Sequence, residues 1–368
     1  MIHDVAVVGL GAMGSATAYQ LAKRGQRVIA FDRYEPPHSL GSHCGESRIT
    51  RVAIGEGEQY VPLVRRSHKI WRDLEKESGE RLLEIRGGLW MSSARRGSEV
   101  HVTDFFNKTL AAARRLGIAH EVLDAQDIRR RFPVFKVKDD EQGYFEPGAG
   151  LVRPEACVRT QLTLATRLGA QLHVGEGVER ISQRGAEVVV ATGRGEHFAK
   201  RAVLAAGAGA VELLPPEVAR LLKVTHQAQY WFEATGHEEL PVWIWELQER
   251  KHGLYGFPSQ GGVVKIATEV FAGEITPEYM FESLVSPHVD GITSHSVKTV
   301  PCLYTQTPDF HFIIDRHPSM DRVLIASPCS GHGFKHSAAI GECLAQWVVD
   351  GRPRIDLSSF ALGRFGAG

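Results

Sequence analysis

The chain contains 368 residues, in which 43 lysines and arginines balance 43 aspartates and glutamates. A formal net charge of zero provides no field that would attract nucleic acid or an anionic membrane surface. No apolar run approaches the ~20 residues that a membrane-spanning helix needs. The length exceeds one ordinary hydrophobic core and therefore predicts two domains.

The cysteine content indicates a reducing compartment. The five cysteines are an odd number and include no Cys-x-x-Cys pair, which argues against a disulfide framework and against a structural zinc site. The N-terminus lacks the basic leader and small-residue cleavage site of a signal peptide. We therefore expect a cytoplasmic protein without a bound metal.

The first part of the chain reads as a complete nucleotide-binding unit. An apolar strand over residues 5–8 leads into a Gly-x-Gly-x-x-Gly turn, a helix over residues 15–24 and a second apolar strand over residues 27–32. A bare Gly-x-Gly-x-x-Gly is weak evidence, and its confirmation is this strand–turn–helix context. A glycine-rich turn without a ligand is the simpler alternative, which the complete unit disfavours.

Each glycine of the turn has a physical reason to be there. Gly9 permits the tight turn, Gly11 lets the backbone approach a pyrophosphate, and Gly14 allows close helix–strand packing. The helix start directs unpaired N–H groups and a positive dipole end toward the diphosphate. Asp32 follows Gly14 by 18 residues, where an acid hydrogen-bonds a ribose hydroxyl and disfavours a 2′-phosphate. The motif predicts FAD or NAD rather than NADP.

The next elements surround a long polar loop. Residues 34–58 are rich in Gly, Pro, Ser and His, and structureless loops of this length are usually functional. An amphipathic helix is predicted over residues 61–77. A strand over residues 82–92, a helix over residues 102–116 and a short helix over residues 127–133 follow.

The second half of the chain alternates between segments of the nucleotide domain and β-rich segments. A helix starting at Pro154 precedes strands that lead into a glycine turn at 207–209, next to the nucleotide unit in space. Residues 227–267 are β-rich, and a strand, a glycine turn and a helix recur over 322–349. We assign residues 1–84, 147–222 and 309–368 to a discontinuous nucleotide domain, and residues 85–146 and 223–308 to a substrate domain with a mixed sheet.

Four segments together carry a family resemblance: residues 41–51, 255–259, 301–305 and 330–335. Their order and content resemble the monomeric sarcosine oxidase and N-methyltryptophan oxidase family of FAD-dependent amine oxidases, over nearly the whole chain. The resemblance implies an α/β fold in which a Rossmann-type FAD-binding domain, like that of glutathione reductase, is interleaved with the mixed-sheet substrate domain.

Cys302 is the expected point of covalent flavin attachment. The family carries FAD as a thioether at a cysteine in this position, and nearby positive charge favours addition of a thiolate to the oxidised ring. On its own, a free cysteine is more often a small buried hydrophobe. Cys329 matches no attachment position, and we interpret it as inert packing.

Two arginines and a lysine are expected to meet anionic groups. The resemblance implies that Arg51 and Lys335 bind the substrate carboxylate and that Arg48 lies beside the flavin. An arginine fork suits a carboxylate and stays charged at any working pH. Without the resemblance, a solvated basic loop would be the better reading of Arg48 and Arg51.

Further cofactor contacts are expected in the same two segments. Ser42 and Ser47 lie in the polar loop, and Gly331 and Gly333 lie in the turn before the last long helix. The amides and dipole of that helix start can face the flavin edge where reduction places negative charge. We assign no proton-transfer role to His332.

Lys265 and Tyr255 complete the expected catalytic set. A lysine within the apolar strand 262–267 is costly to bury unless its charge is used. The family has a lysine here over the flavin, where it promotes the reaction with O2, and a tyrosine at the position of Tyr255 that lines the substrate cavity. Core packing is the alternative for Tyr255.

The sequence departs from the family pattern at two positions. Cys44 and Glu269 each stand where a histidine is usual. Residues 265, 267 and 269 share a strand face, so Glu269 is expected to bind the amine or to pair with Lys265. If the strand ends at Thr268, Glu269 turns outward instead. Trp243 and Trp245 are expected to add bulk to the pocket.

These residues predict a flavoprotein oxidase that converts sarcosine or a related N-methyl amino acid and O2 into the primary amino acid, formaldehyde and hydrogen peroxide. A cyclic secondary amine such as proline or pipecolate is an alternative substrate. An NAD-dependent dehydrogenase and a flavin-binding protein without activity are the alternatives from other classes. We expect a monomer, with no nucleic acid or membrane partner.

Overall fold

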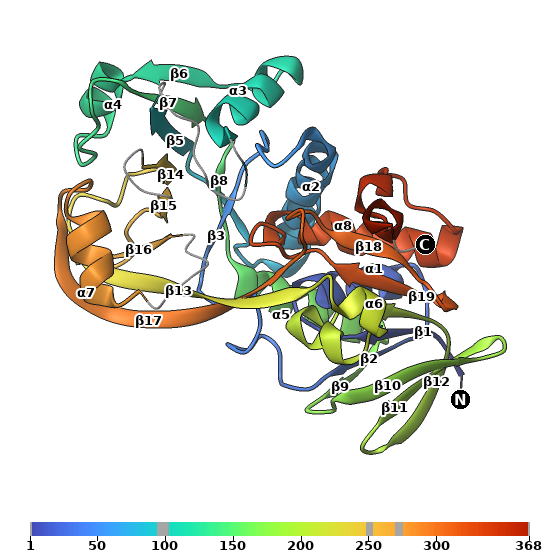
Figure 1. Cartoon of the computed structure of the whole chain (residues 1–368). Helices are drawn as coiled ribbons and strands as arrows, with labels where there is room; N and C mark the ends of the chain where they lie inside the picture. Colours follow the sequence, from blue (N-terminus) through green and yellow to red (C-terminus); the bar gives the residue numbers. More distant parts are fainter. Residues whose placement is uncertain (1, 94–101, 103, 248–252, 269–274, 367–368) are drawn as a thin grey trace.

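The computed structural model describes residues 2–93, 102, 104–247, 253–268 and 275–366, and the strands within these residues form three sheets (Figure 1). All five cysteines fall within these residues and are free thiols. Among the described helices, none is long and apolar enough to cross a membrane.

The first sheet is built around the N-terminal strand. Strands β12, β1, β2 and β9 run parallel in that order, and β19 extends the sheet in parallel beyond β12. Strands β10, β11 and β18 join it antiparallel. The bounds are β1 Ile2–Val8, β2 Val28–Asp32, β9 Gln171–Val174, β10 Val178–Arg184, β11 Glu187–Thr192, β12 Gly195–Leu204, β18 Ile313–His317 and β19 Met320–Ser327.

Both faces of this sheet are covered, which explains why β1 and β2 are apolar runs without alternation. Helix α1 (Ala12–Lys23) packs against α5 (Pro154–Arg167) and α8 (Ser337–Asp350), and α2 (Val61–Ser78) packs on α8. On the other face, Val8 and Phe31 belong to one apolar cluster with Val178 and Val188 of the meander β10–β12. The predicted strands and helices of the nucleotide unit are confirmed.

The second sheet is mixed and has the order β17-β13-β16-β15-β14-β5-β7-β6. Strands β13 and β17 are long and extend from this sheet toward the first one (Figure 1). The bounds are β5 Gly88–Ser93, β6 Glu121–Asp124, β7 Glu141–Glu146, β13 Lys223–Ala234, β14 Val242–Glu246, β15 Gly253–Gly256, β16 Val263–Thr268 and β17 Ile292–Gln306.

A small third sheet, β3 (Arg48–Thr50), β8 (Gly150–Val152) and β4 (Leu83–Ile85), contains part of the long polar loop. The strand predicted over residues 82–92 is therefore two strands, because the chain turns at Gly87, whose φ is +78°. The remaining elements are α3 Phe105–Arg115, α4 Ala125–Arg131, α6 Pro216–Ala219, α7 Pro277–Tyr279, the π-helix Met280–Val285 and the 3-10 helices Glu58–Tyr60, Gly207–Glu212, Phe334–His336, Ser358–Phe360 and Leu362–Phe365.

Candidate active site

A cavity of about 470 Å³ lies where the first sheet, the polar loop and the second sheet meet. It collects most of the residues that the sequence singled out. Those in its wall are Gly9, Gly11, Asp32, Ser42, Ser47, Arg48, Arg51, Tyr255, Lys265, Gly331, Gly333 and Lys335. Gly14 and Cys302 are buried beside this wall, and Glu269 lies outside the described residues.

The nucleotide end of the cavity has the close packing that the glycine pattern predicts. A Cβ added to Gly14 would lie 1.7 Å from the carbonyl oxygen of Gly9, so only glycine allows α1 to start this close to β1. The Asp32 carboxylate accepts the backbone N–H of Leu10 at 2.7 Å and of Tyr34 at 2.9 Å. Burial alone would raise the pKa of Asp32, but His38 and these two amides outweigh it and lower the pKa.

Arg48 and Cys302 lie against each other at the join between the polar loop and β17. Arg48 Nη2 is 3.4 Å from Cys302 Sγ and also donates to the carbonyl oxygen of Ser42 at 3.1 Å. A fixed guanidinium at this distance stabilises negative charge on the sulfur or on a group bonded to it.

Cys44 packs beside this pair. Its thiol donates to the carbonyl oxygen of Pro301, the residue before Cys302, at 3.6 Å. Hydrogen bonding with the Cys302 thiol lowers the pKa of Cys44 to about 6, against the effect of burial. The hydrogen bond with Cys44 and burial raise the pKa of Cys302, so Cys44 is the more acidic thiol of this pair.

Arg51 and Lys335 converge from different elements, and a residue that the sequence analysis missed lies between them. Arg51 Nη2 bonds to Glu56 Oε2 at 2.6 Å, and Lys335 Nζ is 3.7 Å from Glu56 Oε1. Lys335 also donates to the carbonyl oxygen of His332 at 2.8 Å. The side chains of Arg51, Glu56 and Lys335 are at most 4% exposed. The two cations thus already bind one carboxylate, that of Glu56.

Lys265 reaches from β16 to the polar loop. Its Nζ donates to the carbonyl oxygens of Gly45 at 2.7 Å and Ser47 at 2.5 Å, and it lies 4.0 Å from the centre of the Phe257 ring. Burial, and secondarily the charge of Arg48, lowers the pKa of Lys265 well below that of an exposed lysine.

The two tryptophans of β14 do not shape the cavity, so the expectation that they add bulk to it is wrong. Successive residues of a strand point to opposite faces, and Ile244, opposite Tyr255, lies in the cavity wall with Glu246. Trp243 and Trp245 point the other way and pack against Phe135. The sequence pattern did not predict that Glu246 lines the cavity, because both faces of this strand are largely buried.

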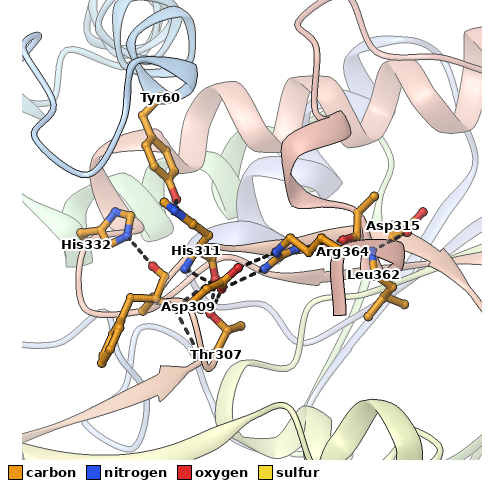
Figure 2. A network of polar contacts seen from close by, with 11 residues as sticks. Tyr60, Thr307, Asp309, His311, Asp315, His332, Leu362 and Arg364 are labelled. Carbon is orange, nitrogen blue, oxygen red and sulfur yellow. Dashed lines mark hydrogen bonds and ion pairs between the residues drawn. The ribbon is translucent and has the colours of Figure 1, made fainter. Parts of the chain in front are cut away.

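A polar network supports the turn that contains Gly331 and Gly333 (Figure 2). Tyr60 Oη lies 2.8 Å from His311 Nδ1, and His332 Nε2 lies 3.1 Å from the carbonyl oxygen of Phe310. Asp309 binds Arg364 of the C-terminal segment through Nε at 2.7 Å. The hydrogen bond to Phe310 therefore holds one side of the His332 ring, and its Nδ1 lies 3.9 Å from Glu56 Oε1.

The fold and the cavity define a flavin-dependent oxidoreductase. The family model described as FAD dependent oxidoreductase matches residues 4–347, and the chain belongs to this family. It is 36% identical to a monomeric sarcosine oxidase of Streptomyces avermitilis, over 95% of this chain and 94% of that protein. It is 33% identical to an N-methyl-L-tryptophan oxidase of Yersinia pestis, over 99% and 100%.

A solved structure agrees with these relatives. NikD, described as an unusual amino acid oxidase essential for nikkomycin biosynthesis, superposes with a TM-score of 0.86 at 27% identity, covering 98% of this chain and 97% of that one. The predicted family and the mixed α/β, FAD-binding fold are confirmed. The chain is an FAD-dependent oxidase of the sarcosine oxidase and N-methyltryptophan oxidase type, which removes the NAD-dependent alternative.

The residues present fit FAD. A Cβ on Gly9 would lie 2.6 Å from the carbonyl oxygen of Ala205, and one on Gly333 would lie 1.7 Å from that of Pro328, so both turns bring backbone to the cavity wall. Asp32 supplies an acceptor at one end of the cavity and Arg48 a half-buried cation near Cys302. This donor and acceptor set suits a dinucleotide with an anionic diphosphate and an electron-accepting ring.

Proposed function

We propose that this oxidase demethylates sarcosine or a related N-methyl amino acid. The N-methyl amine, O2 and water give the primary amino acid, formaldehyde and hydrogen peroxide. The observation that carries the proposal is the convergence of Arg51 and Lys335 on one carboxylate in the cavity wall. The names of the relatives support the same class of substrate.

The cofactor site would use both glycine turns. Gly9, Gly11, Gly14 and Asp32 would hold the nucleotide part of FAD, together with Ser42, Ser47, Gly331 and Gly333. When bound, FAD accepts a hydride equivalent from the carbon next to the amine nitrogen and returns two electrons to dioxygen. The protein supplies position and fixed charge.

Cys302 is proposed as the covalent link to FAD. The Arg48 guanidinium, 3.4 Å from Cys302 Sγ, stabilises the charge that the reaction needs. Acid precipitation of the purified enzyme should leave the yellow colour with the polypeptide. Cys302→Ser should release it, whereas the control Cys329→Ser should not. Colour that leaves the wild-type polypeptide on precipitation would contradict the covalent link.

The substrate carboxylate would replace that of Glu56 on Arg51 and Lys335. Tyr255, in the wall of the same cavity, would limit where the N-methyl group lies. Glu269 stays a candidate for binding the amine. A cyclic amino acid offers the same carboxylate and secondary amine, so the clamp alone does not distinguish proline or pipecolate from sarcosine.

Lys265 is proposed to promote the reaction with oxygen. Dioxygen gains negative charge as it is reduced, and a buried cation stabilises that charge more strongly than one in water. The charge of Arg48 contributes, after burial, to lowering the pKa of Lys265, so the two side chains lie close together and would act in the same region.

Product analysis tests the proposed substrate class. The enzyme should form equal amounts of formaldehyde and hydrogen peroxide from sarcosine. Peroxide without formaldehyde, obtained from L-proline or L-pipecolate but not from sarcosine, would establish the cyclic alternative instead. We further propose that the enzyme is a cytoplasmic monomer with the two domains assigned above, and gel filtration tests its oligomeric state.

A further inference from the structure

Two histidines and a glutamate from separate segments meet away from the active-site cavity. His173 lies in β9, Glu176 in the connection from β9 to β10, and His197 in β12. His173 Nδ1 is 2.9 Å from Glu176 Oε2, and His197 Nε2 is 3.1 Å from Glu176 Oε1. One nitrogen of each imidazole and a carboxylate oxygen lie within 4.8 Å of one another.

These distances match a metal site. Zinc binds imidazole nitrogen and carboxylate oxygen at about 2.0–2.2 Å in tetrahedral geometry, which places neighbouring ligand atoms roughly 3.4 Å apart. The two N···O separations given above are a few tenths of an ångström shorter, because these atoms are hydrogen-bonded to each other. Zinc binding would require each of these pairs of atoms to move apart by those few tenths of an ångström.

The surroundings provide the support that metal ligands need. Thr192 Oγ1 donates to Glu176 Oε1 at 2.6 Å and so orients the carboxylate, as groups next to metal ligands commonly do. The Phe31 ring lies against both imidazoles, with centroids 5.1 Å from His173 and 4.8 Å from His197. Both rings are therefore held in place from one side.

The cluster is also accessible from solvent. The Glu176 side chain is 3% exposed, whereas those of His173 and His197 are 29% and 23% exposed. Glu176 forms part of the wall of a second, open cavity of about 630 Å³. An ion can therefore enter, and water can fill the fourth ligand position.

We propose that His173, Glu176 and His197 bind one divalent zinc ion. Imidazole with a carboxylate is a ligand set suited to zinc. The expectation of no metal rested on cysteine spacing alone, which does not bear on this cluster, in which His173 and Glu176 are three residues apart and His197 lies 21 residues beyond Glu176.

The ion would join the edge strand of the parallel sheet to the meander that covers it. The backbone N–H of Glu176 donates to the carbonyl oxygen of Asp32 at 2.9 Å, so the site is also linked to the segment that would bind the ribose of FAD. Zinc would stabilise this end of the FAD site without taking part in the reaction.

Arg194 competes with the ion and provides a sharp test. Its Nη1 is 3.4 Å from Glu176 Oε2, and its side chain is 68% exposed. A bound zinc ion would repel this guanidinium and displace it into solvent. Arg194→Ala should therefore bind zinc more tightly than the wild type, whereas a site that exists only as an ion-pair cluster would gain nothing.

The experiment uses the flavin-loaded enzyme after treatment with a chelator and dialysis. Zinc chloride is titrated in by calorimetry, and the metal content after dialysis is measured by mass spectrometry. His173→Gln and His197→Gln test the ligands, and either variant suffices if the other does not fold. The control is His295→Gln, because His295 Nδ1 also pairs with a carboxylate, Glu233, at 3.0 Å but belongs to no group of three potential metal ligands among the described residues.

We expect one zinc ion per chain, a higher Tm with zinc, and binding weakened at least about tenfold in His173→Gln and His197→Gln but unchanged in His295→Gln. Flavin absorbance without zinc should match the wild type, which separates metal loss from misfolding. Failure of the wild type to bind one equivalent, or equal binding by the ligand variants, would overturn the site. Neither result bears on the proposed oxidase activity.

Discussion

Glu56 lies between the two cations that we propose as the clamp for the substrate carboxylate. Its bond to Arg51 at 2.6 Å is buried, and a substrate must displace it. Glu56→Gln removes the competing anion, so acetate should bind about tenfold more tightly, as judged by the change in flavin absorbance. Arg51→Gln should have the opposite effect. Weaker acetate binding by Glu56→Gln would contradict the clamp.

The same substitution should destabilise the free enzyme. Removing one partner of a buried ion pair leaves the other charge uncompensated, which costs about 3–5 kcal/mol. The Tm of Glu56→Gln should therefore fall without acetate and recover when acetate is added. An unchanged Tm would show that Arg51 finds other partners.

Lys265 should control oxidation of the reduced enzyme by air. Lys265→Met should slow this step on the order of 10²-fold in stopped-flow measurements, while acetate affinity changes little. Because burial lowers the pKa of Lys265, its ammonium form is lost at a lower pH than that of an exposed lysine. The wild-type rate should fall as the pH rises through this range, and the rate of Lys265→Met should not. Parallel pH profiles would exclude Lys265.

Among the contacts between elements, the one between α1 and β1 leaves no room for an added side-chain atom. A Cβ on Gly14 would lie 1.7 Å from the carbonyl oxygen of Gly9, a backbone atom that cannot move aside cheaply. Gly14→Ala should therefore give protein with little or no bound flavin. Gly148→Ala is the matched control, since its Cβ would meet nothing within 4 Å. Normal flavin content in Gly14→Ala would show that the helix start can shift.

The sequence predicted the elements whose pattern is local. Strands β1 and β2 were predictable because runs buried on both faces are apolar throughout. The first half of β17 was not, since its residues are mostly exposed and polar. The face of β14 on which Trp243 and Trp245 lie was also not predictable, because a strand buried on both faces shows no alternation of apolar and polar residues.

At the scale of the whole molecule, the site depends on contacts between distant segments. Glu56 lies on the polar loop near Arg51, but its contact with Lys335 joins residues far apart in the chain. No local sequence pattern predicts such a contact. The family resemblance pointed to Arg51 and Lys335 but not to the Glu56 carboxylate between them. In the cluster of His173, Glu176 and His197, the first two residues are close in the chain, but only the fold brings His197 to them.

Anaerobic mixing of the purified enzyme with sarcosine tests the central proposal most directly. We predict that the flavin absorbance bleaches, that it returns when air is admitted, and that formaldehyde accumulates. Flavin that stays oxidised with sarcosine but bleaches with L-proline or L-pipecolate would contradict the N-methyl substrate while leaving the oxidase intact. Flavin that stays oxidised with all three would contradict the proposed substrate class as a whole.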